Sequence, residues 1–245
     1  NAIDRFVLRR IEEAGLRPAG EADRRTLIRR LSLDLLGLPP TIGEVDAFLA
    51  DRRPGAYHRL VDRLLDSPRF GERLALQWMD AARYADTHGY HEDYNRDMWP
   101  WRDWVIAALN ADMPYDRFIL EQIAGDTVQA DAALGFLVAG PALQSGQIGR
   151  DEEAMRSARQ DELDEVIRTV GQGFLGLTIG CARCHDHKFD PINQNDYYSM
   201  QAIFSGLKYG QRRLRGTQND DWNTKLPAQR AKVEALKVDL EKLRL

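Results

Sequence analysis

Residues 22–36 read ADRRTLIRRLSLDLL, and residues 37–40 read GLPP. Apolar and basic side chains in this stretch recur at the spacing of an α-helix, which places them on separate faces. The apolar face consists of Leu27, Ile28, Leu31 and Leu35, and the basic face of Arg24, Arg25, Arg29 and Arg30. Glycine and two prolines then end the helix. The stretch therefore predicts an amphipathic helix that buries one side in a core.

The same period recurs along the chain. Thr41 with Glu44 three residues later forms the pattern of a capping box, which opens another short helix. Strand patterns are almost absent, so the predicted class is mainly α: an irregular multi-helix domain with long polar loops. We expect helices over residues 3–11, 22–36, 41–49, 57–65, 69–84, 99–110, 114–123, 152–174 and 195–204.

Three segments are expected along the chain. Residues 1–210 form one domain, and residues 211–225 are a polar, glycine-bearing linker. Residues 226–245 begin an exposed, coiled-coil-like amphipathic helix that leads to a further domain. Because no charged-then-apolar leader precedes the first helix, we expect a processed chain or an excised domain.

Composition narrows the class of protein. The chain has 245 residues, 43% hydrophobic and 29% charged, which is typical of a globular protein. Its net charge of −4 argues against a nucleic-acid partner, which would call for a basic surface. No apolar run reaches the 18 or so residues of a membrane span, so we expect none in this segment.

The two cysteines of the chain, Cys181 and Cys184, are three residues apart, and His185 follows directly. This spacing favours a covalently attached haem c, with both thiols bonded to the porphyrin and His185 as the proximal iron ligand. A zinc or iron site that adds His187 is one alternative, although four ligands within seven residues suit a tetrahedron poorly. A redox dithiol or local disulfide is the other. Haem attachment would place the chain outside the cytoplasm.

Neighbouring residues are candidates for supporting roles. Asp186 or Asp190 could accept a hydrogen bond from the second ring nitrogen of His185, and the alternative for each is an ordinary turn cap. For the distal face of the haem, we expect His88 or His91, since His187 lies too close to His185 in sequence to reach across the ring. The methionines that could replace them are Met98, Met113, Met155 and Met200.

Residues 85–97 are polar, aromatic and histidine-bearing, with no helical or strand period. Irregular connections of this kind often carry binding sites. A second hypothesis therefore makes His88, His91 and Asp93 the active site of a hydrolytic or polysaccharide-active module. The cysteine motif would then be a structural metal or thiol site. A third is a scaffold or carbohydrate-binding module, and whether the chain is an enzyme stays open.

Long motifs resemble a known family. They lie at residues 3–6, 29–40, 78–90, 99–106, 110–114, 121–126 and 176–192. Together they resemble the planctomycete-type cytochrome domain family DUF1549, also called PSCyt2. The resemblance implies a periplasmic, envelope or secreted haem protein within a larger polypeptide. It also implies an adjacent cytochrome domain or other redox partner and a C-terminal DUF1553-like domain, but no particular reaction.

Overall fold

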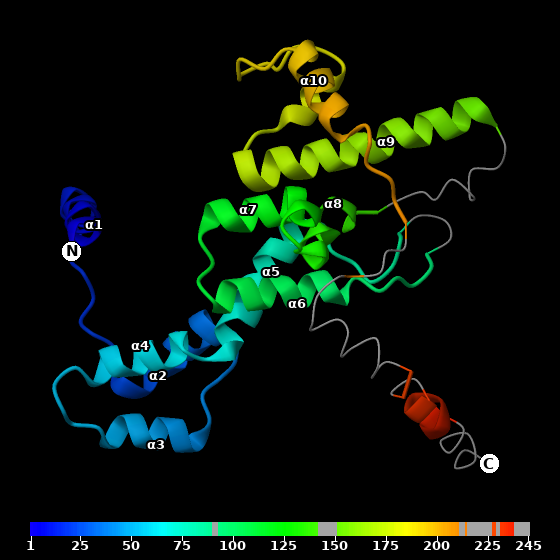
Figure 1. Cartoon of the computed structure of the whole chain (residues 1–245). Coiled ribbons are helices and arrows are strands. Elements are labelled where there is room, and N and C mark those ends of the chain that lie inside the picture. The colour runs from blue at the N-terminus through cyan, green and yellow to red at the C-terminus, as the bar shows by residue number, and fades with distance from the viewer. Residues whose placement is uncertain (90–92, 142–150, 211–213, 215–226, 229–230, 238–245) are drawn as a thin grey trace. The chain divides into compact units, whose positions relative to one another are not determined.

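A computed structural model describes residues 1–89, 93–141, 151–210, 214, 227–228 and 231–237. This part of the chain is mainly helical, and its one β contact is an isolated bridge between Thr87 and Asn95 (Figure 1). The predicted fold class is confirmed. The structure divides the chain into two compact units, an N-terminal unit, Asn1–Arg73, and a C-terminal unit, Leu74–Leu245, a subdivision that the sequence analysis did not make.

The N-terminal unit has a small core between three helices, α2 (Arg24–Leu36), α3 (Ile42–Ala50) and α4 (Ala56–Leu65). The ends of these helices follow local sequence signals. Gly37 ends α2 in the left-handed conformation that glycine adopts without strain, and the predicted capping box opens α3. The buried apolar side chains are Ile28, Phe48, Ala56, Leu60 and Leu64.

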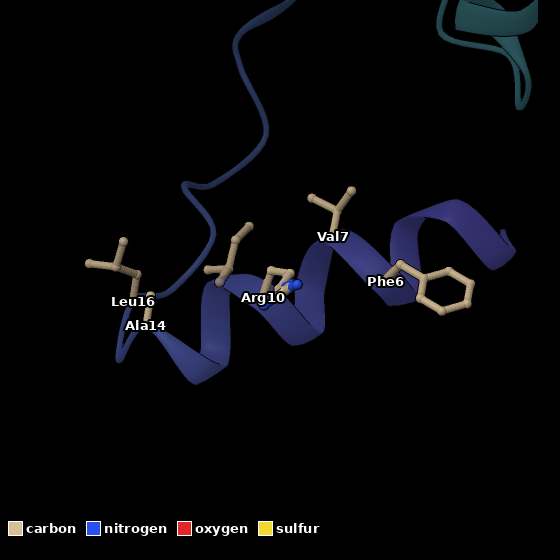
Figure 2. A pocket seen from close by; sticks show the side chains of 6 residues that line it. Phe6, Val7, Arg10, Ala14 and Leu16 are labelled. Atoms are coloured by element: carbon tan, nitrogen blue, oxygen red, sulfur yellow. The ribbon is translucent and has the colours of Figure 1, made fainter. Parts of the chain in front are cut away.

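Helix α1 (Ala2–Glu13) contributes no buried side chain. Its apolar side is a shallow, open groove, which Figure 2 shows from close by. The groove is lined by Phe6, Val7, Arg10, Ile11, Ala14 and Leu16. The helical prediction is confirmed for this segment, but its apolar face is not part of the unit's core.

Helix α5 (Pro68–Ala81) leads into the C-terminal unit, which contains the larger core. Trp101 and Phe136 are almost fully buried there, and Trp78 stacks on Phe136 at a ring-centre distance of 5.6 Å. The buried amide of Gln122 accepts hydrogen bonds from the indoles of Trp78 (2.8 Å) and Trp101 (3.3 Å), so both indole N–H groups are paired. The remaining helices are α6 (Trp99–Asn110), α7 (Tyr115–Ala124), η1 (Gly125–Thr127), η2 (Asp131–Leu134), α8 (Gly135–Val138), α9 (Glu152–Val170), η4 (Gly171–Leu175), η5 (Ile179–Arg183) and α10 (Gln194–Phe204).

The helix expected over residues 152–174 changes character before its predicted end. Regular α-helix stops at Val170, a π-helical turn follows, and Gly176 closes it in the left-handed conformation with φ +65°. This break turns the chain into the cysteine segment. None of the described helices has the length and apolar character needed to cross a membrane.

The structure describes only part of the segment for which a linker and a C-terminal helix are predicted. Of the expected linker over residues 211–225, all but Leu214 lies outside the described residues. Within the expected helix over residues 226–245, residues 231–237 are helical, and Val233 and Leu236 are exposed.

Candidate functional site

Cys181 lies on η5, a short 3-10 helix, and Cys184 directly follows its last residue. Ile179 and Ala182 are buried and fix the turn to the core, whereas Cys181 and Cys184 are exposed with free thiols. The N–H of Cys181 donates to the Thr178 carbonyl at 3.2 Å, and that of Cys184 to the Cys181 carbonyl at 3.5 Å. The turn therefore buries its apolar residues and leaves both cysteine residues exposed.

His185 is exposed directly after this turn. Its Nδ1 lies 2.8 Å from the backbone oxygen of Asp186. Because a carbonyl oxygen only accepts hydrogen bonds, Nδ1 carries the proton and donates it. Nε2 then holds the lone pair of the neutral ring, as a metal-binding imidazole requires.

His187 has the opposite environment, with a side chain only 6% exposed. Its Nδ1 accepts from the backbone N–H groups of Asp190 at 2.9 Å and Phe189 at 3.3 Å. The proton is therefore on Nε2, which donates to the Thr178 hydroxyl at 2.9 Å. Through these hydrogen bonds the two ring nitrogens hold the loop of residues 186–192 together and join it to Thr178. His187 therefore has a structural role.

In the structure, the carboxylates of Asp186 and Asp190 have partners other than His185. The Asp186 carboxylate accepts from the backbone N–H of Gln194 at 2.9 Å, at the start of α10, and that of Asp190 lies 3.2 Å from Nδ1 of His187. Neither carboxylate contacts His185. The backbone carbonyl of Asp186 orients His185 instead, because the helix N-terminus offers the carboxylate an unpaired N–H.

A charged network lies behind the turn. Asp164, on α9, is 5% exposed and accepts hydrogen bonds from the Tyr197 hydroxyl and from Nε of Arg168, each at 2.6 Å. Arg183, on the cysteine turn, lies 3.3 Å from the same carboxylate and donates to Asp161 at 2.9 Å. Burial, followed by the hydrogen bond to Asp164, raises the pKa of Tyr197 well above its ordinary range, so this phenol stays a donor.

The metal-site alternative finds no support in the geometry. Within the described residues, no group of three or more His, Cys, Asp or Glu side chains is placed to hold a metal ion. Cys181, Cys184, His185 and His187 therefore do not form a preassembled tetrahedral site. The other alternative is a redox dithiol or a local disulfide, and in the structure both cysteines are free thiols.

The polar loop of residues 85–97 is organised by its own hydrogen bonds. The guanidinium of Arg96 donates to the backbone carbonyls of residues 85 and 138–140, which fixes the loop to the end of α8. Asp93 accepts from the N–H of Gly89 at 2.7 Å, where the chain turns with φ +68°. Burial, and then the charge of Arg96, lowers the pKa of His88, while Asp93 opposes them. His91 lies outside the described residues.

The expected distal ligand, His88 or His91, stays a prediction. Figure 1 draws the loop, in teal, beside α6, whereas the cysteine turn lies at the α10 end of the same unit. The structure holds Cys181, Cys184 and His185 together at the end of η5. Among the candidate methionines, Met113 and Met200 pack against the core.

The chain matches a known protein family over most of its length. The model of the family described as "PSCyt2: Protein of unknown function (DUF1549)" matches residues 2–209. No curated protein and no solved structure shows detectable similarity to the chain. The family description names no activity.

Proposed function

We propose that this chain, which belongs to the PSCyt2 (DUF1549) family, is an extracytoplasmic domain that binds haem c and serves electron transfer or haem-dependent redox chemistry in a larger protein. Cys181 and Cys184 would hold the haem covalently, and Nε2 of His185 would bind its iron from one side. Bound haem would supply a one-electron couple at that iron.

One observation carries the proposal: the different use of two histidines two residues apart. His185 is exposed with its Nδ1 already donated, so its remaining nitrogen is free to bind a metal. His187 is buried with both nitrogens used within the loop. Of the histidines beside the thiols, the chain therefore presents the one that adjoins Cys184.

The free thiols fit covalent attachment. Each thiol would add across one vinyl double bond, forming one carbon–sulfur bond and giving its hydrogen to the other vinyl carbon. This addition needs no oxidant. Since it would use both cysteines of the chain, no thiol would remain to form a wrong disulfide in an oxidising compartment.

The exposed position of the site supports a redox partner. Cys181, Cys184 and His185 are all exposed, so a neighbouring protein surface could approach a haem held there. The adjacent cytochrome domain that the resemblance implies is our candidate, and a DUF1553-like domain would follow in the chain. The alternative active site around His88, His91 and Asp93 is less favoured, because the described contacts of Asp93 close the loop itself.

Intact mass tests the proposal directly. The full chain is exported in a bacterial host that matures c-type cytochromes, beside a Cys181→Ser/Cys184→Ser variant as control. We expect the wild-type mass to include one porphyrin, and its Soret absorbance to stay with the polypeptide through acid–acetone extraction. The control should have neither property. A wild-type chain of unmodified mass and without colour would refute the proposal.

A further inference from the structure

Asp164 connects the buried core to the turn that carries the thiols. It is one of the few buried carboxylates of the C-terminal unit, and its partners come from three elements. Tyr197 of α10 and Arg168 of α9 bond to it, and Arg183 of η5 is within ion-pair distance. A buried carboxylate is costly without such partners, so its presence calls for an explanation.

The two arginines act at opposite ends of the turn. Arg168 packs against its first half, and Arg183 is its last residue. Arg168 lies against Gly180, the residue before Cys181, so closely that a side-chain carbon on Gly180 would overlap the guanidinium. Arg183 lies between the two cysteines in sequence. Its carbonyl accepts from Gln194 at 3.1 Å and from the Tyr198 hydroxyl at 3.2 Å. One carboxylate therefore restrains the chain on both sides of Cys181.

We propose, on the basis of the haem attachment proposed above, that Asp164 is a positioning residue for the haem-binding turn. By fixing Arg168 and Arg183, it holds Cys181, Cys184 and His185 in one arrangement before haem arrives. Two bonds to a rigid porphyrin and one to its iron require three atoms at set separations. A turn that is already ordered loses less entropy when those bonds form.

Asp161 provides the matched comparison. It pairs with the same Arg183, but its side chain is 54% exposed, whereas that of Asp164 is 8% exposed. An exposed ion pair contributes little, because water screens it and both side chains lose freedom. Loss of the Asp164 charge removes the carboxylate partner of Arg168 and leaves Arg183 with Asp161 alone. A comparison of Asp164→Asn with Asp161→Asn thus separates the loss of positioning from the loss of one negative charge near Arg183.

The first experiment uses the haem-free full chain and measures amide hydrogen exchange in a peptide covering residues 178–185. Asp164→Asn retains the size of the side chain and an oxygen for Tyr197, but removes the charge that holds the arginines. We expect exchange in this peptide to become about tenfold faster, equivalent to about 1.4 kcal/mol. Asp161→Asn should leave it unchanged, and a peptide from α6 serves as the folded reference.

Gly180→Ala gives an independent variant. The added methyl would push the flexible end of Arg168 away from the turn while Asp164 stays intact. We expect faster exchange in the same peptide, with the α6 reference again unchanged.

The second experiment measures haem loading by intact mass in the maturation host. Asp164→Asn should lower the loaded fraction severalfold, and Asp161→Asn should match the wild type. Unchanged exchange in Asp164→Asn, beside a haem-loaded wild type, would overturn the positioning role alone. A wild type that never gains haem would instead remove the proposed function. If the wild type never gains haem but Asp164→Asn still exchanges faster, Asp164 orders the turn and has no role in haem binding.

Discussion

Substitution of two histidines that lie two residues apart should have opposite consequences. In the haem-free chain, His187→Ala removes three hydrogen bonds that close residues 186–192. At about 0.5–1.5 kcal/mol each, their loss should lower the free energy of unfolding by about 3 kcal/mol. His185→Ala removes one exposed contact to the neighbouring residue, so its effect should stay within about 0.5 kcal/mol.

Tryptophan fluorescence suits this measurement, because every tryptophan of the chain lies in the C-terminal unit that carries both histidines. A free-energy loss of 3 kcal/mol in a unit of this size corresponds to a Tm lower by about 6–12 °C for His187→Ala. For His185→Ala, Tm should change by less than about 2 °C.

The haem-loaded chain should give the opposite ranking. His185→Ala removes the proposed axial imidazole, so the visible spectrum should change in spin state, whereas any loaded His187→Ala chain should retain the wild-type spectrum. If His187→Ala melts at the wild-type temperature, or if His185→Ala is the more destabilised variant, the assignment of the two rings is wrong.

Two further predictions concern other parts of the C-terminal unit. Burial raises the pKa of Tyr209 to about 12, from about 10 for an ordinary tyrosine. Because the folded pKa is the higher one, the stability it contributes is complete below pH 10 and is lost as the pH rises towards 12. Urea unfolding at pH 9 and 11 should therefore show a loss larger by about 1 kcal/mol in wild type than in Tyr209→Phe, and equal losses would contradict the assignment. Gly135→Ala should destabilise the C-terminal unit by about 1–3 kcal/mol, because its methyl would overlap the side chain of buried Trp101. Gly206→Ala, where the methyl meets open space, is the control and should leave Tm unchanged.

Most helices could be predicted because their signals are local. The capping box of Thr41 and Glu44 and the glycine at position 37 act within one turn of the residues they affect. Residues 125–138 were not predicted, since they form two 3-10 turns and one turn of α-helix. Such short elements lack the 3.6-residue repeat and are shaped by tertiary contacts, such as that between Gly135 and Trp101.

Only part of the candidate site could be predicted from the sequence. The grouping of Cys181, Cys184 and His185 could be predicted because adjacent residues must lie together. The role of Asp164 could not, since one of its partners is 33 residues away. A signal did exist: Asp164 falls among the apolar positions of α9, between buried Leu163 and Val166, where a charged side chain needs a partner.

The positions of these polar groups bear on what they do. Buried charges can often be replaced by apolar side chains of similar size without loss of stability, so stability alone does not account for them. Around the cysteine turn, Asp164 and His187 are both buried or nearly so, and each is fully engaged with partners that bound the turn or the loop after it. An exposed trio of reactive side chains needs no such support in order to remain on the surface. It needs support in order to keep three atoms at fixed separations, as attachment to a rigid ligand requires.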